Sequence, residues 1–188
     1  MSRKKIIIPM SLGLKGEFRA LVHKGDGVPI RETPYGDNII TAGGIDYALD
    51  NISAGYCVAG DGNATPALGD VTLDSYKGKM TTHLGVTGTV NNNPGLGDLW
   101  ISSEARVQFV PGAFGVSAVN IAEAGFTRTG SLGSITSATP LFNRGLLVDT
   151  LGNPTTVAVQ PDEYLDLFWR LTVNLPYQAA GTVSIDVD

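Results

Sequence analysis

The sequence predicts a mainly β protein, an antiparallel β-sandwich (a jelly roll is one such architecture) with one short α-helix and an extended N-terminal arm. Glycine and proline account for 24 and 10 of the 188 residues, and many of them separate short apolar runs, as tight turns separate strands. Several runs alternate apolar and polar residues with a period of two, and one segment has the 3.6-residue period of a helix. We expect an arm over residues 1–15 and a single β-sandwich domain over residues 16–188.

The first elements are the arm and a hairpin. Three isoleucines at 6–8 are stiff β-branched residues, and Pro9 blocks a helix there. Because such a stretch on a free tail would promote aggregation, we expect the arm to dock on its own sheet or on a neighbouring subunit. Residues 18–22 and 28–33 are predicted strands joined by a turn at 24–27, and Pro29 favours an edge position for the second strand.

The helix is predicted over residues 41–52. Its apolar residues fall at i, i+3, i+4 and i+7 and form one stripe, Thr41 can cap its start, and Gly55 lies just past its end. Gly43 and Gly44 each weaken it by about 1 kcal/mol relative to alanine, so it must be held by packing on a sheet. The stripe consists of Ile45, Ala48, Leu49 and Ile52.

Beyond the helix the period changes to two. In the alternating run 105–110, Ala105, Val107 and Phe109 share one face, and Pro111 ends the strand. We expect strands at 56–59, 105–110 and 116–121, a turn or loop at 60–66, and exposed loops at 85–98 and 129–140 because these are rich in Gly, Asn, Pro, Ser or Thr.

The longest alternating run covers residues 164–173 and is the strongest predicted strand. Five apolar residues occupy one of its faces without a break, and at about 3.3 Å per residue it spans roughly 33 Å. Residues 145–149 and 155–159 flank a turn at 151–154 and predict a second hairpin, and 181–187 predict a final strand. The five apolar residues are Leu165, Leu167, Trp169, Leu171 and Val173.

The composition argues against nucleic acid and membranes as partners and favours neighbouring protein subunits. The net charge is −5, and the one basic cluster, at residues 3–5, is too small for a nucleic-acid surface. No stretch of about 20 apolar residues could span a membrane. Charged residues make up only 16% of the chain against a typical value of about 25%, which is expected if neighbouring subunits cover part of the surface.

Residues with catalytic or metal-binding chemistry form no recognisable motif. Cys57 is the single cysteine and lies in an apolar run, so we expect a buried thiol without a disulfide or a paired-cysteine metal site. His23 and His83 are expected to be structural or surface residues. The sequence at 60–63, Gly-Asp-Gly-Asn, resembles part of a calcium loop, but the other acidic ligands are missing, and a tight turn is the better interpretation.

Acidic and aromatic residues leave two further options open. Sugar cleavage needs two carboxylates on either side of a bond, and stacking on sugars needs exposed rings. Trp169 is in phase with the core face, whereas Trp100 precedes a strand in a Gly-rich context. We assign no catalytic, cofactor-binding or metal-binding residue. The acidic residues considered are Glu104, Glu123, Asp162, Glu163 and Asp166. Solvation at a turn explains Asp162 and Glu163. The third aromatic residue considered for stacking on sugars is Tyr164.

The order of several motifs resembles small virion structural proteins of tailed bacteriophages, described as tail, fibre or collar proteins. The resemblance extends over roughly residues 16–175. The matching stretches are 37–41, 44–46, 58–67 with Ala59 as an insertion, 122–126, 141–146 and 157–167.

The resemblance implies a non-enzymatic structural subunit located in the virion and made in the bacterial host cytoplasm, in the tail, collar or fibre-attachment region. It implies copies of itself and other virion proteins as partners, without nucleic acid, membrane or cofactor, and we expect a homo-oligomer. The alternative is a carbohydrate-binding module that recognises host surface glycans, and a third hypothesis is an enzyme such as a cell-surface depolymerase.

Overall fold

The computed structural model describes residues 13–45, 56–80, 82–91, 98–127 and 132–176, and over these ranges it is mainly antiparallel β structure. One helical turn covers residues 42–45, and a short 3₁₀ helix, η2, covers Leu132–Ser134. The strands are β1 (Gly13–His23), β2 (Arg31–Glu32), β3 (Gly36–Ile40), β4 (Cys57–Gly60), β5 (Tyr76–Lys79), β6 (Thr82–Asn91), β7 (Asp98–Phe109), β8 (Val119–Ile121), β9 (Glu123–Thr127), β10 (Leu141–Leu146), β11 (Val157–Val159) and β12 (Tyr164–Pro176).

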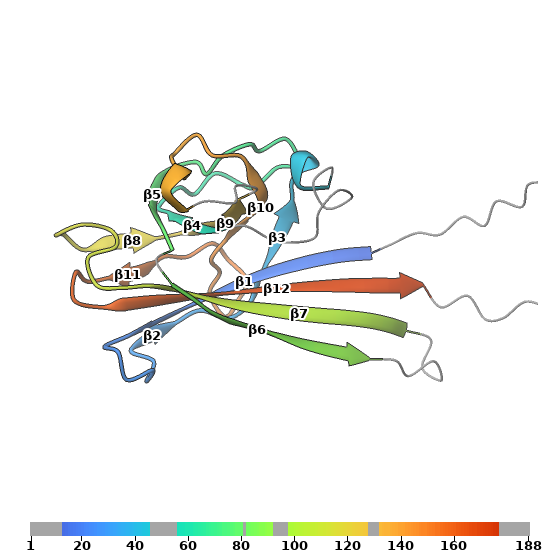
Figure 1. Cartoon of the computed structure of the whole chain (residues 1–188), viewed down its shortest axis with the longest axis horizontal. Coiled ribbons are helices and arrows are strands. Elements are labelled where there is room, and N and C mark those ends of the chain that lie inside the picture. The colour runs from blue at the N-terminus through green and yellow to red at the C-terminus, as the bar shows by residue number, and fades with distance from the viewer. Residues whose placement is uncertain (1–12, 46–55, 81, 92–97, 128–131, 177–188) are drawn as a thin grey trace, which may run out of the picture.

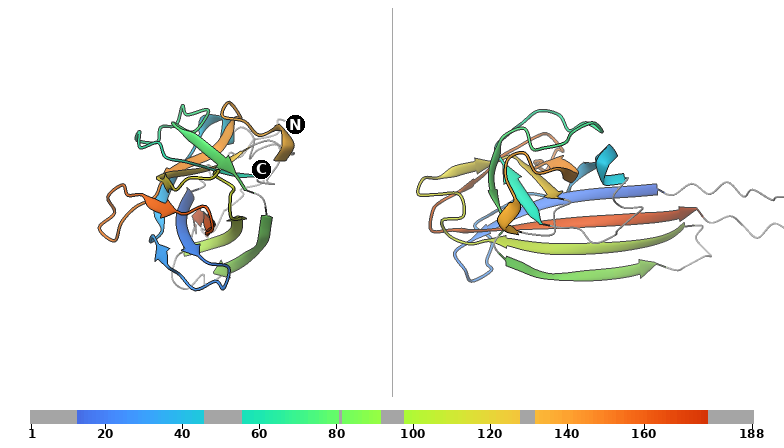
Figure 2. Two further views of the ribbon diagram at one scale, coloured as in Figure 1. Left: turned by 90° about the vertical axis from the view of Figure 1, so that its left-hand side faces the viewer. Right: turned by 45° about the horizontal axis from the view of Figure 1, so that its top comes forward.

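The predicted β-sandwich is formed mainly by one curled sheet. Its strand order is β5-β4-β9-β10-β3-β1-β12-β7-β6, with β2 attached to β1, while β8 and β11 form a separate two-stranded sheet. The outermost strands β5 and β6 follow one another in the chain, and the step from Lys79 to Thr82 spans at most about 11 Å. The sheet must therefore curl until its two edges meet at that corner, and the end-on view in Figure 2 shows this curl.

The half of the sheet made of β1, β12, β7 and β6 contains the long strands (Figure 1). Phe18 pairs with Trp169 and Trp169 with Ala105, so the residues predicted to share a face do so in register across three strands. Leu167 is completely buried, and Trp169 is 7% exposed. The alternation over residues 105–110 is confirmed, because one face of this half packs on the core. Over residues 164–173 it is confirmed only in part. Leu165, Leu167 and Trp169 are buried, but Asp166 and Phe168 on the other face are buried as well, and Leu171 and Val173 are half-buried.

The other half of the sheet closes the core with aromatic contacts. Phe126 on β9 lies with its ring centroid 4.5 Å from that of Trp169 and 6.2 Å from that of Phe18. Phe142 on β10 meets Trp169 edge-on at 5.9 Å. Such ring pairs add about 0.5–1.5 kcal/mol each beyond the area they bury, so this group ties the two halves together.

Strands β4, β9 and β10 are buried on both faces. Their second face carries a smaller apolar cluster of Val58, Leu73, Ile135 and Leu141, which the loops at 61–75 and 132–140 cover. Every residue of these three strands is buried. A strand covered on both sides has no reason to alternate, which is why the period-two pattern indicates neither β9 nor most of β10.

Two predicted loops are wrong in whole or in part. Residues 85–91 belong to β6 and residue 98 begins β7, because the Thr and Val residues between and after the glycines favour a strand and the segment pairs along β7. In the predicted exposed loop 129–140, Ile135 is 3% and Thr139 is 9% exposed, since this segment covers β4 and β10. Residues 92–97 and 128–131 lie outside the described ranges.

The predicted second hairpin is confirmed only at its turn. β10 pairs with β9 and β3, and β11 pairs with β8, so residues 145–149 and 155–159 do not form a strand pair. Only the bridge between Val148 and Pro154 and the adjoining hydrogen bonds close the turn around residue 151. Turn residues predicted the reversal correctly, but the flanking strands bury more surface by pairing elsewhere.

Several element boundaries can be compared directly. The hairpin of β1 and β2 is confirmed, although β2 has only two residues, and β1 begins at Gly13, inside the predicted arm. Thr41 caps the helical turn, since its Oγ1 accepts a hydrogen bond from Gly44 N at 3.0 Å. β8 begins at Val119, not at residue 116. Residues 1–12, the remainder of the predicted helix at 46–52 and the predicted strand at 181–187 lie outside the described residues.

We expect Leu167→Ala to lower the free energy of unfolding by about 2–5 kcal/mol, because it leaves a cavity where the two halves of the sheet meet. Urea denaturation followed by tryptophan fluorescence measures this. The control is Val116→Ala, at a side chain that is 95% exposed, which should change stability by no more than about 0.5 kcal/mol. Equal effects of the two substitutions would contradict the assignment of the core.

Candidate interaction surface

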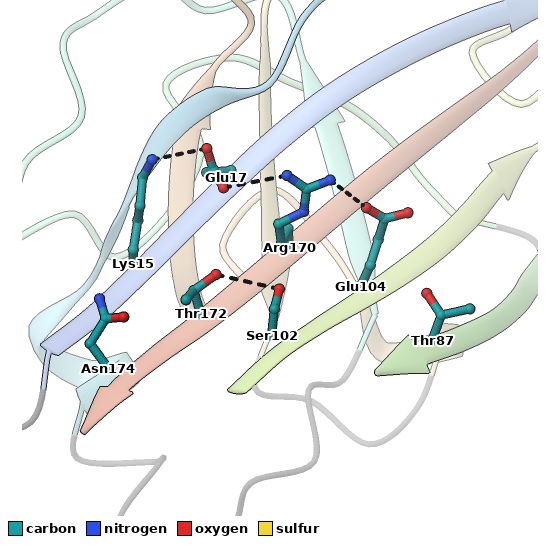
Figure 3. Close-up of a pocket in the computed structure, with 8 residues that line it drawn as sticks. All are labelled: Lys15, Glu17, Thr87, Ser102, Glu104, Arg170, Thr172 and Asn174. Atoms are coloured by element: carbon teal, nitrogen blue, oxygen red, sulfur yellow. Dashed lines mark hydrogen bonds and ion pairs between the residues drawn. The ribbon is translucent and has the colours of Figure 1, made fainter. Parts of the chain in front are cut away.

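The long half of the sheet turns its second face outward, and this face is polar. It is hollowed into a groove of about 520 Å³ that crosses β1, β12, β7 and β6 (Figure 3). We call it the polar groove. On β1, β12 and β7 the residues that line it alternate with residues that face the core, such as Phe18, Trp169 and Ala105. They are Lys15, Glu17, Thr87, Ser102, Glu104, Arg170, Thr172 and Asn174.

Ion pairs run across the strands of the polar groove. Arg170 lies between two carboxylates, 3.8 Å from Glu17 and 3.1 Å from Glu104. Lys15 lies 3.0 Å from Glu17 and 3.2 Å from Asp37, and its hydrogen bonds to these two carboxylates raise its pKa. Opposite charges on neighbouring strands are the pairing that stabilises a sheet face. The groove is therefore close to neutral as a whole.

Tyr35 lies across the same face and joins it to the connection between β2 and β3. The guanidinium of Arg170 lies 3.8 Å from its ring centroid and that of Arg19 lies 5.3 Å away, both within the range of cation–π contacts. Its hydroxyl donates a hydrogen bond to Glu104. Desolvation by burial, with a smaller effect of that hydrogen bond, raises the pKa of Tyr35 to about 12. Sequence analysis does not indicate Tyr35, because it stands in a connection without periodicity.

The five acidic residues considered from the sequence are distributed among different cations. Asp162 pairs with Lys24, Glu104 with Arg170 and Asp166 with Arg106. Each of these carboxylates therefore has its own basic partner. The remaining pairs are Glu163 with Arg31 and Glu123 with Arg144.

Solvation does not explain Glu163, contrary to the sequence-based interpretation. Its side chain is only 4% exposed, whereas that of Asp162 is 70% exposed. The Glu163 carboxylate accepts hydrogen bonds from Arg31 and from Gln160 N, the latter at 2.8 Å. It therefore fixes the turn that opens β12, which a carboxylate dissolved in water could not do.

His23 is buried and closes the turn of the first hairpin. Its Nδ1 accepts hydrogen bonds from Gly25 N at 2.9 Å and Gly27 N at 3.3 Å. The proton is therefore on Nε2, which lies 3.2 Å from Asp166 Oδ2. Tyr164 stacks on the imidazole with a centroid distance of 5.1 Å. Both backbone hydrogen bonds go to the same ring nitrogen, so His23 fixes the hairpin turn. The side chain of His83, on β6, lies outside the described residues.

A second charged group is buried between β9, β10 and the loop at 61–75. Glu123 is completely buried, and its carboxylate accepts hydrogen bonds from Ser75 N at 2.7 Å, Asp74 N at 3.1 Å and Arg144 Nε at 2.7 Å. We call this arrangement the Glu123 centre. The centre attaches the long loop to the sheet through the backbone N–H groups of Asp74 and Ser75.

Arg144 extends the Glu123 centre toward the far end of the loop. Its side chain is 3% exposed and donates to Asp70 at 2.7 Å and to the carbonyl of Ala64 at 2.9 Å. Burial acts against ionisation of Asp70, but hydrogen bonds from Ala67 N and Arg144 outweigh it and lower the pKa of this carboxyl group. All the charges in the centre therefore have partners.

The Gly-Asp-Gly-Asn sequence at 60–63 wraps around this carboxylate. A Cβ placed at Gly60 would lie 2.6 Å from Glu123 Oε1 and 2.3 Å from Ser75 O, and one at Gly62 would lie 2.5 Å from Glu123 Oε1. Close backbone approach thus requires both glycines. Among the described residues, no group of three or more His, Cys, Asp or Glu side chains could hold a metal ion.

The two tryptophans and the cysteine considered from the sequence complete the comparison. Trp169 packs in the core, as predicted. Trp100 lies in β7, but its side chain is not among those described. Cys57 is completely buried, and desolvation raises the pKa of its thiol, which disfavours the reactive thiolate. In the described part of the chain, no helix is long and apolar enough to cross a membrane.

Comparison of the chain with protein-family models, with curated proteins and with solved structures found no match.

We expect Arg144→Met to lower the free energy of unfolding by about 3–5 kcal/mol, because it leaves the Glu123 carboxylate buried without its cation. Chemical denaturation measures the change. Lys15→Met, which removes a half-exposed ion pair, should cost no more than about 1 kcal/mol. The double variant Glu123→Gln with Arg144→Met should recover part of the loss, and equal costs for Arg144→Met and Lys15→Met would contradict the role of the centre.

A second prediction concerns Tyr35. Tyrosinate absorbance after a rapid pH jump should show one group that titrates near pH 12 and is missing in Tyr35→Phe. Because this pKa is raised in the folded protein, the stabilisation is complete below pH 10 and is lost as the pH rises through about 12. Glu104→Gln should lower the pKa of Tyr35 by removing the carboxylate acceptor. A difference titration between wild type and Tyr35→Phe centred at pH 10 would contradict the burial of this ring.

Proposed function

We propose that this chain is a non-enzymatic structural subunit of a tailed-phage virion, in the tail, collar or fibre-attachment region, and that it acts through contacts with copies of itself and other virion proteins. Its mechanism is assembly. The curled sheet supplies a rigid body, and surfaces outside the core supply the contacts.

The observation that carries the proposal is the spatial convergence of the motifs behind the phage-protein resemblance. The stretches at 37–41, 58–67, 122–126 and 141–146 fall on or directly follow β3, β4, β9 and β10, and these four strands are neighbours in the sheet. The Glu123 centre joins three of them. The motifs are thus separate parts of one packing unit, which supports a structural role for the sequence features that suggested the family.

The charged groups support the same proposal. The carboxylates considered for catalysis each lie beside a cation instead of converging on a shared cleft. Apolar side chains stand on turns, where Val116 is 95% and Leu151 is 84% exposed, and a neighbouring subunit would bury them. The paired carboxylates and the exposed apolar side chains both support a protein that acts through contacts with other subunits.

A carbohydrate-binding module remains the alternative, with weaker support. Two of the three aromatic residues that suggested it have other tasks, since Trp169 packs in the core and Tyr164 stacks on His23. The polar groove offers hydroxyl and amide groups, but the charged side chains that line it already pair with one another.

The test is to raise antibodies against the purified chain and to analyse gradient-purified particles of the phage that encodes it by immunogold microscopy and quantitative mass spectrometry. We expect a fixed, integral copy number per particle and labelling at the tail, the collar or the base of the fibres. A chain that is absent from washed particles would contradict the proposal. Binding of the pure chain to a glycan array, together with absence from particles, would favour the alternative.

A further inference from the structure

The two edges of the curled sheet differ in a way that bears on assembly. β6 is ten residues long and pairs with β7 on one side, and within the described residues no strand lies on its other side. It follows the lower margin of the sheet in Figure 1. Its sequence, Thr-His-Leu-Gly-Val-Thr-Gly-Thr-Val-Asn, contains no Lys, Arg, Asp, Glu or Pro. Natural sheets usually place such residues on an exposed edge to prevent pairing with another chain.

The opposite edge has those protective features. β5 is only four residues long and carries Lys77 and Lys79, and its pairing with β4 is interrupted by a register shift. Lys77 lies 3.0 Å from Asp61, and Lys79 donates to the carbonyl of Ile135 at 3.3 Å. The protein therefore blocks one edge and leaves the longer one without charge.

We propose that β6 is an interface strand that pairs antiparallel with β6 of a second copy of this chain about a twofold axis. The inference rests on the proposed role as an assembling subunit and names one of its contacts. A twofold contact brings each residue near its own symmetry mate, so any charged residue close to the axis would meet a like charge. β6 is the edge that avoids this conflict, whereas a head-to-tail contact would have to use the short, lysine-bearing β5.

The pairing register follows from the shape of the strand. A bulge between His83 and Gly85 leaves a regular ladder over residues 85–91, whose midpoint is Gly88. Leu84, Thr87 and Gly88 are exposed, so the middle of the strand is accessible. With the axis at Gly88, Thr87 faces Thr89 of the second copy. The long halves of both copies then form one continuous sheet, with the two polar grooves on the same side.

The first experiment introduces cysteine at the axis. In Gly88→Cys, the two Cα atoms would be about 4.5–5.5 Å apart, within the range of a disulfide. A Cβ fits at this position, since the nearest atom is Ser102 O at 3.9 Å. Mild oxidation with diamide should give a covalent dimer on a non-reducing gel. Cys57 is buried and cannot compete, and Thr172→Cys, two strands inside the sheet, should remain monomeric on the gel.

The second experiment uses charge. Thr87→Lys with Thr89→Lys places like charges opposite each other across the axis and should weaken dimerisation at least tenfold by sedimentation velocity. Thr172→Lys with Asn174→Lys adds the same charge to the same face away from the edge and should leave the dissociation constant unchanged. Equal urea midpoints for both variants at concentrations where each is monomeric would show that folding is intact.

The outcomes separate this inference from the proposed function. A monomeric wild-type chain without cross-linking at position 88 overturns the β6 pairing, and so does an oligomer that is insensitive to the lysines at 87 and 89. In either case, presence in washed particles would still uphold the structural role. A β6 dimer that is absent from particles would uphold the pairing and contradict the virion role.

Discussion

The structure depends most on one buried carboxylate. Glu123 sits where β9, β10 and the loop at 61–75 meet, and it is fully withdrawn from water. Such a charge costs several kcal/mol to desolvate, and only complete pairing offsets this. Two backbone N–H groups and Arg144 provide that pairing, and Arg144 in turn holds Asp70 and the carbonyl of Ala64. An ion pair with such specific geometry secures a single arrangement of the loop, which an apolar contact would define less strictly.

The fixed loop has consequences for the sheet. It covers the second face of β4, β9 and β10 and allows these strands to be buried on both sides. The core face of the same strands packs against β1, β12 and β7 through Phe126, Phe18 and Trp169. One half of the curled sheet is thus an interior layer, while the other half has a core face and a polar face. Glu17, Glu104 and Arg170 lie on that polar face, whereas Glu123 and Arg144 form a buried pair.

This division leaves distinct surfaces for interaction. The polar groove is a network of compensated charges in which Arg170 joins Glu17 and Glu104, and Tyr35 lies over it. The edge at β6 is uncharged, and the edge at β5 is protected by lysines. The proposed role in a virion and the proposed β6 contact agree with this arrangement.

The amino-acid sequence by itself determined the mainly β, antiparallel class, the first hairpin, the cap at Thr41 and the core faces of β7 and β12, because these follow from local turn chemistry and from alternation along a half-buried strand. It could not indicate β9 and most of β10, because their burial on both faces removes the alternation. It could not indicate β6 either, because a stretch rich in glycine is typical of a loop. Tyr35 acquires its role only from partners far away in the chain, and Glu163 and His23 combine hydrogen bonds to nearby backbone with distant partners, Arg31 and Asp166. Tertiary structure decided how the strands beyond the first hairpin pair, because their pairing depends on the total surface buried by the whole sheet and not on any one segment.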